Sequence, residues 1–213
     1  FVILSSGCPR TENKSRPGAE TLTKDVGKKV IWTFWDKGES RLNGFGKINI
    51  RTWKTLLPDW EIKVIDFVEG SPFHYRNFIK ESDLPAEFEK MAMIQQQSDH
   101  VRILLLRDYG GIWIDSSTIL LQNLEPWAWE PIAKGQADIV GFHQTRYGRP
   151  GVPEGFENWF IASRKGNAFI TKWQEIFRSY WNHRSKSINI LGHELFRGLQ
   201  LSPTFPWGSA DYL

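Results

Sequence analysis

Short apolar runs alternate along the chain with longer segments in which apolar residues recur at helical spacing. Runs at 30–35, 61–66 and 112–114 are rich in β-branched and aromatic residues, a pattern typical of buried strands. An amphipathic pattern at 45–56, which stops before Pro58, predicts a helix between the first two strands. We expect further helices at about 86–108 and 167–181, and further strands at 137–142 and 159–162.

This alternation indicates an α/β fold around a mostly parallel central sheet flanked by helices. The run at 112–114 is apolar at every position, as in a central strand that is covered on both faces. It follows Gly110 and Gly111, one of which supplies the left-handed C-cap of the preceding helix. Residues 5–27 are polar, so 1–27 are expected to be a poorly ordered lead-in and 28–213 a single domain.

The composition narrows the classes of function. The single cysteine, Cys8, excludes an internal disulfide and a cysteine-based metal site, so any metal must rely mainly on carboxylates. The net charge is +3, and Lys and Arg are mixed with acidic residues instead of following one stripe. This favours a small anionic ligand, such as a nucleotide diphosphate, over a nucleic acid. Eleven tryptophans exceed what one core needs, so some of them are expected to face a ligand.

The start of the chain leaves the cellular location open. No apolar run approaches the roughly 20 residues that span a bilayer. The first residues, Phe-Val-Ile-Leu, are either the end of a removed signal or anchor or an arbitrary boundary. We expect a cytoplasmic or membrane-peripheral protein, and the pattern gives no oligomeric state.

The strongest candidate site lies where a helix passes into the buried strand. Gln95, Asp99 and Arg102 share one side of that helix, because they are four and three positions apart. Asp115 directly follows the strand, and ligands of open α/β sheets bind outside the carboxyl ends of the strands. We therefore expect two carboxylates and a guanidinium to meet in one crevice. The alternatives are a surface ion pair and an Asp115 that only caps the Ser-Ser-Thr turn after it.

The same residues resemble a known signature. Ser98-Asp99-x-x-Arg102, followed by the segment Tyr-Gly-Gly-Ile-Trp-Ile-Asp-Ser-Ser at 109–117, is similar to glycosyltransferases of the capsular-polysaccharide-synthesis type. These belong with the wider transferases whose sugar-binding region contains a DXD motif. Weaker similarity extends over about residues 28–180, including the first strand and the segment around Trp159.

The resemblance implies a GT-A fold, which is a Rossmann-like single domain. It implies transfer from a nucleoside-diphosphate sugar, with a UDP-sugar favoured, to a glycan or other hydroxyl acceptor. Mn²⁺ or Mg²⁺ would assist the transfer. We expect no nucleic-acid partner, and peripheral membrane association is left open. Asp99 and Arg102, with Ser98, would bind the donor sugar. Asp115 would lie near the ribose, the sugar and the metal, as a catalytic, nucleotide-binding and metal-binding residue. The remaining nucleotide-binding residues would be Trp32, Thr33, Phe34 and Trp35.

One position departs from the signature. The last residue of the DXD motif is Ser117 in place of an aspartate, so the usual direct metal carboxylate is absent. A hydroxyl is a weak neutral ligand for hard cations, so either another side chain completes the metal site or the metal dependence is reduced. His193 is the first candidate ligand, before Asp138 and Glu157, although a lone histidine also suits a packed or surface position.

An inverting transferase also needs a general base near the acceptor hydroxyl. Glu157 is the first candidate for this base, and Asp138 and Asp36 are the next candidates. In a retaining enzyme Glu157 would only position substrate, and a loop carboxylate without a role is the third alternative. Two other functions stay open: a non-catalytic carbohydrate-binding module, commonly all-β, and a single-strand nucleic-acid binder whose aromatic residues stack on bases.

Overall fold

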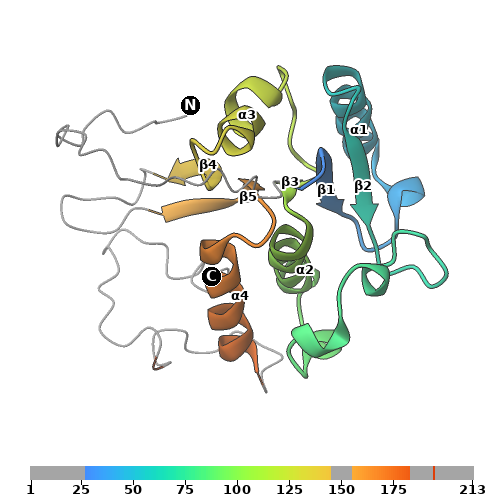
Figure 1. The fold of residues 1–213 in the computed structure, drawn as a ribbon. Helices are drawn as coiled ribbons and strands as arrows, with labels where there is room; N and C mark the ends of the chain where they lie inside the picture. Colours follow the sequence, from blue (N-terminus) through green and yellow to red (C-terminus); the bar gives the residue numbers. More distant parts are fainter. Residues whose placement is uncertain (1–26, 145–154, 183–193, 195–213) are drawn as a thin grey trace, which may run out of the picture.

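The computed structural model describes residues 27–144, 155–182 and 194 (Figure 1). The expected lead-in at 1–27 therefore lies almost entirely outside the described residues. The strands are β1 (Val30–Phe34), β2 (Glu61–Ile65), β3 (Gly111–Ile114), β4 (Ile139–Gln144) and β5 (Gly155–Ser163). The α-helices are α1 (Gly44–Leu56), α2 (Ile94–Tyr109), α3 (Glu130–Ala133) and α4 (Ala168–Trp181). The short helical turns are η1 (Glu39–Arg41), η2 (Tyr75–Asn77), η3 (Glu81–Asp83), η4 (Phe88–Lys90) and η5 (Glu125–Trp129).

The strands form one sheet in the order β2-β1-β3-β5-β4. β1 pairs in parallel with β2 and β3, whereas β5 pairs antiparallel with both β3 and β4. Four strands therefore run in one direction and β5 alone is reversed. The predicted α/β fold with helices on both faces of the sheet is confirmed, and it does not match the all-β architecture common among carbohydrate-binding modules.

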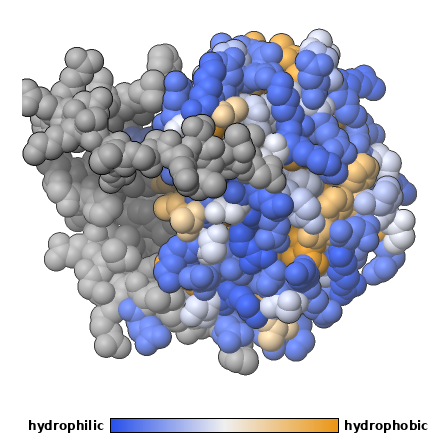
Figure 2. Space-filling view, in the orientation of Figure 1, coloured by the Kyte–Doolittle hydropathy of each residue, from blue (hydrophilic) through white to orange (hydrophobic). Residues whose placement is uncertain are grey.

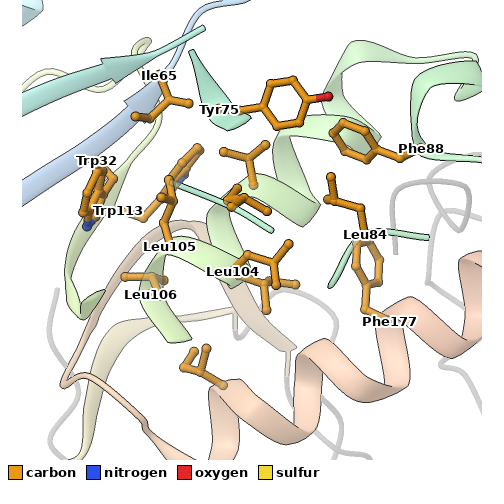
Figure 3. Close-up of a cluster of buried hydrophobic side chains, with 14 of the residues drawn as sticks. Trp32, Ile65, Tyr75, Leu84, Phe88, Leu104, Leu105, Leu106, Trp113 and Phe177 are labelled. Carbon is orange, nitrogen blue, oxygen red and sulfur yellow. The ribbon is translucent and has the colours of Figure 1, made fainter. Parts of the chain in front are cut away.

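Helices cover both faces of the sheet, with α1 and α3 on one side and α2 and α4 on the other (Figure 1). The core is accordingly divided into two clusters of buried side chains. Ile112 and Ile114 of β3 point into the cluster with α1 and α3, and Trp113 between them points into the cluster with α2 and α4 (Figure 3). All of β3 is buried, as its uninterrupted apolar sequence predicts.

Two glycines make the connection from α2 to β3 possible. Gly110 and Gly111 have φ angles of 68° and 96°, a region that residues with a side chain seldom adopt. A Cβ atom on Gly111 would lie 2.6 Å from the backbone oxygen of Val30. The double glycine therefore ends the helix and also lets β3 approach β1 closely.

The structure corrects two of the expected element boundaries. The helix expected from about residue 86 begins at Ile94, and the residues before it form the short turn η4. Phe88 and Met91 are nevertheless buried, because a single helical turn and an extended segment bring them into the same core as the helix. The strand expected at 159–162 is longer and begins at Gly155.

Most of the tryptophans belong to the core, so their number alone does not indicate a ligand. The buried indoles are those of Trp32, Trp53, Trp60, Trp113, Trp129 and Trp181. Trp35, Trp127, Trp159 and Trp173 are partly buried against the two clusters, and Trp207 lies outside the described residues. Within the described ranges, none of the helices has the length and apolar character that crossing a bilayer requires.

Candidate functional site

A single guanidinium joins two carboxylates at the carboxyl end of β3. Arg102 is buried on α2, and its Nη1 lies 2.8 Å from Oδ1 of Asp99, one turn earlier on the same helix. Its Nη2 lies 3.1 Å from Oδ1 of Asp115, the first residue after β3. The structure thus brings together the three residues that the helical spacing and the strand end placed in one crevice.

Trp113 contacts both Asp115 and Arg102. Its indole Nε1 donates a hydrogen bond of 2.7 Å to Oδ1 of Asp115. Its ring also faces the Arg102 guanidinium, whose central carbon lies 4.9 Å from the ring centroid, a cation–π arrangement. One oxygen of Asp115 therefore has two donors, while the other has no donor among the described residues. The Asp115 side chain is 35% exposed, so a ligand can reach this side chain.

The turn that follows Asp115 is held by α1. The Asn49 side chain donates to the backbone oxygen of Ser116 at 2.8 Å, and the Trp53 indole donates to that of Thr118 at 3.1 Å. Within the turn, the backbone amide of Thr118 donates a further hydrogen bond to the backbone oxygen of Asp115. Asp115 and the exposed Ser117 are thus presented on a rigid support.

The pKa of the Asp99 carboxyl group is raised toward neutral pH. Its side chain is only 15% exposed, and this burial raises its pKa to about 6. The Arg102 charge lowers the pKa and the Asp115 charge raises it, and both effects are smaller than that of burial. Asp99 is mainly ionised at neutral pH, so it can accept hydrogen bonds from hydroxyl groups.

An irregular part of β5 lies beside these residues. Gly141 and His143 of β4 pair with Ile161 and Phe156 of β5. The two β4 residues are two positions apart, whereas their partners are five positions apart, so β5 contains extra residues in this stretch. Such bulges are frequent next to active sites. From this stretch the Asn158 amide reaches Oδ1 of Asp99 at 3.4 Å, and Glu157 next to it is half-buried. The candidate base therefore lies on a strand that contacts the Asp99–Arg102 pair.

The residues expected to bind the nucleotide separate into two groups. Phe34 and Trp35 are half-buried where β1 ends, and the Trp35 indole donates to the backbone oxygen of Arg41 at 3.1 Å. Thr33 is fully buried. Trp32 points instead toward the α2 layer, and its indole donates to the oxygen of Gly110 at 2.8 Å, at the opposite edge of the sheet.

A cavity of about 290 Å³ opens at that opposite edge, lined by Trp32 together with residues such as Lys28, Lys63, Phe78 and Tyr109. Trp32 therefore lines this cavity, whereas Asp99, Arg102 and Asp115 do not.

Asp138 does not lie beside Asp115. Asp138 precedes β4, is exposed, and its Oδ1 lies 2.9 Å from Nη2 of Arg164. Ile139 and Gly111 both pair with Ser163, so Asp138 lies near the start of β3, about 13 Å from its end at the usual rise per residue. The expectation that it works together with Asp115 is corrected, because the strand direction puts it at the other edge. His193 lies outside the described residues.

Two contacts of the site do not follow from the sequence patterns. The apolar run assigns Trp113 to core packing alone, although a tryptophan two positions before an aspartate on a strand points to the same side as it. Asn158 gives no usable signal, because its approach to Asp99 depends on the reversed direction and irregular pairing of β5.

The donor groups at this edge fit a divalent cation only in part. In the part of the chain that the structure describes, no three His, Cys, Asp or Glu side chains gather as a metal site. Asp115 offers one free oxygen, and Ser117 follows two positions later. Mg²⁺ is commonly held by one or two carboxylates together with substrate phosphates and water. The residues therefore fit a cation that is bound mainly by a diphosphate.

Comparisons with known proteins show the family to which the chain is similar. The family model described as capsular polysaccharide synthesis protein matches residues 11–200. The chain is 32% identical over 200 residues to an O-glycosyltransferase of Annulohypoxylon truncatum, covering 90% of this chain and 47% of that protein. It is 33% identical over 207 residues to a glycosyltransferase of Aspergillus fumigatus, covering 89% of this chain and 52% of that protein. The chain thus spans about half the length of the curated relatives that it matches.

The solved structure of a protein named PaToxG Glycosyltransferase has a similar fold. The TM-score is 0.51 and the identity is 19%, over 73% of this chain and 60% of that chain. At this identity the likeness concerns the fold, and it is consistent with a GT-A-like architecture.

Proposed function

Because the chain belongs to the capsular polysaccharide synthesis protein family, we propose that it transfers a sugar from a nucleoside-diphosphate sugar, with UDP-sugars favoured, to a hydroxyl group of an acceptor. Relatives named as O-glycosyltransferases support an oxygen acceptor. The acceptor class that we propose is a glycan or another molecule with an accessible hydroxyl.

The observation that carries this proposal is the bridge from Asp99 through Arg102 to Asp115 at the carboxyl end of β3. Buried polar atoms normally have hydrogen-bond partners, yet Nε of Arg102 is buried and has none among the described residues. One Asp115 oxygen also has no donor among the described residues, and the side chain is 35% exposed. A rigid, partly exposed carboxylate beside a fixed cation suits a ligand that carries both hydroxyl groups and negative charge.

In the proposed complex Asp99 accepts hydrogen bonds from hydroxyls of the donor sugar. Arg102 keeps Asp99 and Asp115 at a fixed separation, so the sugar is oriented before reaction without reorganisation of the site. The free oxygen of Asp115 faces the ribose and the diphosphate. Phe34 and Trp35, half-buried at the end of β1, remain available for the base.

A divalent cation is part of the proposal because the leaving group is a diphosphate. Asp115 and Ser117 would hold it together with the phosphate oxygens, and as a Lewis acid it would stabilise the charge that develops on the leaving group. With one carboxylate in the motif, we expect binding of the cation to depend strongly on the presence of the nucleotide.

For the acceptor we propose Glu157 as the group that removes the hydroxyl proton, if the reaction inverts the anomeric carbon. It is half-buried on β5, next to Asn158, which contacts Asp99. If the reaction retains configuration, Glu157 positions the acceptor only. Glu157→Gln distinguishes these roles, since loss of a base lowers kcat at unchanged donor affinity and makes kcat independent of pH over the range in which the base titrates.

The decisive experiment is isothermal titration of the protein with UDP, GDP and their sugars, each with Mn²⁺ and with EDTA. We expect micromolar to millimolar binding of at least one nucleotide sugar and its loss in Asp115→Asn. The matched control is Asp138→Asn, which makes the same chemical change on an exposed residue at the opposite edge and should bind as the wild type does.

Three results would contradict the proposal. One is the absence of binding to every nucleotide sugar by protein with a native circular-dichroism spectrum. Another is equal loss of binding in the two variants. The third is sugar transfer by Asp115→Asn at the wild-type rate.

A further inference from the structure

Exposed apolar side chains gather where α1 meets the turn that follows β3. Four of the nine large apolar residues that are exposed in the described part of the chain lie here: Phe45 and Ile48 on α1, and Ile119 and Leu121 after the turn. Their exposure ranges from 48% to 89%, and Leu121 is the most exposed of all nine. Scattered apolar residues on a surface are ordinary, but a group this concentrated needs a reason.

Two hydrogen bonds from the buried side of α1 hold the two segments against each other. Asn49, one turn after Phe45, donates to the Ser116 oxygen, and Trp53 donates to the oxygen of Thr118, the residue before Ile119. Figure 2 shows apolar side chains at the upper edge of the molecule, where the loop after β3 turns beside the helix labelled α1 in Figure 1. We call Phe45, Ile48, Ile119 and Leu121 the apolar rim.

The outer side of α1 next to the apolar rim is positively charged. The helix contains three cations and no Asp or Glu. Lys54 pairs with Glu39 at 3.0 Å, whereas Lys47 and Arg51, four positions apart and both exposed, form no ion pair with the described residues. The inner side of the same helix is fixed in the core through Ile50 and Trp53.

From this arrangement we propose that α1 and the apolar rim dock on an anionic lipid bilayer, with the apolar rim inserted among the headgroups and with Lys47 and Arg51 on the anionic lipids. Apolar side chains beside exposed Lys and Arg are the pattern of helices that lie in a membrane interface. The centre of a protein–protein interface is instead depleted of lysine. Docking leaves the inner contacts of α1 intact, so it needs no unfolding of the helix.

The inference is independent of the proposed transfer reaction. Its consequence for the protein is geometric, because the same two hydrogen bonds from α1 support the turn that presents Asp115 and Ser117. A bilayer on the apolar rim would lie beside the candidate site.

The test is flotation of the purified protein with vesicles of phosphatidylcholine alone and of phosphatidylcholine mixed with phosphatidylserine. We expect binding to the mixed vesicles that weakens with added salt, and much weaker binding to phosphatidylcholine. In Lys47→Gln/Arg51→Gln the partition coefficient should fall about 25-fold, since each basic residue at an anionic surface contributes about five-fold. In Leu121→Ser it should fall about ten-fold through loss of one inserted apolar side chain.

Matched controls carry comparable changes on α4. Lys172→Gln/Arg178→Gln and Phe169→Ser alter exposed residues of that helix and should bind vesicles as the wild type does. Absence of binding to the mixed vesicles, equal binding to both vesicle types, or equal loss in the α4 controls would each overturn the proposal. A wild type that is dimeric in light scattering and becomes monomeric in Leu121→Ser would also overturn it, because a second copy would then cover the apolar rim.

Discussion

Replacing Trp113 by phenylalanine separates its two contacts in the site. The aromatic ring that faces Arg102 is retained, whereas the indole N–H that donates to Asp115 at 2.7 Å is lost. A hydrogen bond to a charged group contributes about 1.5–3 kcal/mol. Since Asp115 is 35% exposed and keeps its contact with Arg102, the lower end applies, which corresponds to about a ten-fold fall in kcat/KM for the donor.

The same substitution also removes volume from the core, so it needs a control of equal size. Trp181 lies in the same buried cluster, is 1% exposed like Trp113, and its indole nitrogen has no hydrogen-bond partner among the described residues. Both variants should lose on the order of 1–3 kcal/mol of the free energy of unfolding. Only Trp113→Phe should also show the fall in kcat/KM for the donor.

The assay is the initial rate of transfer at several donor concentrations, with urea unfolding of each variant measured in parallel. Equal values of kcat/KM in Trp113→Phe and Trp181→Phe would refute the reasoning, because loss of packing alone would then explain the effect. An unchanged kcat/KM in Trp113→Phe would show that Arg102 alone suffices to orient Asp115.

Further predictions concern protonation, backbone and metal. The raised pKa of Asp99, about 6 against 3.8, gives stability that is present below pH 4 and lost as the pH rises through 6; urea unfolding of Asp99→Asn should lack this loss. Burial lowers the pKa of His100 from 6.5 to about 3, so its contribution is present above pH 6.5 and lost as the pH falls toward 3, and His100→Gln should be less sensitive to acid. Gly111→Ala should lose about 3 kcal/mol or fail to fold, whereas Gly135→Ala, with φ of 68° and open space around it, should lose about 1 kcal/mol, as measured by thermal unfolding. Ser117→Asp should raise Mn²⁺ affinity in the presence of UDP by titration calorimetry, and unchanged affinity would place the cation elsewhere.

The parts of the fold that the sequence predicts well are those with a strong local pattern. The buried strand at 112–114, the double glycine before it and the capped helix after Asn167 follow from periodicity and from backbone conformation. The pattern misplaces the start of α2, since Phe88 and Met91 continue an apolar spacing without a continuous helix. Residues 125–133, with two tryptophans and two prolines, show no clear period and form η5 and α3.

The candidate site shows the same division. The approach of Asp99, Arg102 and Asp115 could be predicted, because one helix face and one strand end determine it. The position of Asp138 could not, because an apolar run does not reveal the direction of its strand in the sheet. The contact from Asn158 depends further on the irregular pairing of β5, which arises only when β4 and β5 come together.

The four-residue strand β3 has a consequence for how the protein tolerates mutation. Its side chains alternate between the two core clusters, so the position of Asp115 depends on packing on both faces of the sheet. Substitutions that loosen either core should therefore reduce activity while the protein still folds. In a selection from random variants, we expect rescue of such losses by second changes in the opposite layer, far from the site in the chain.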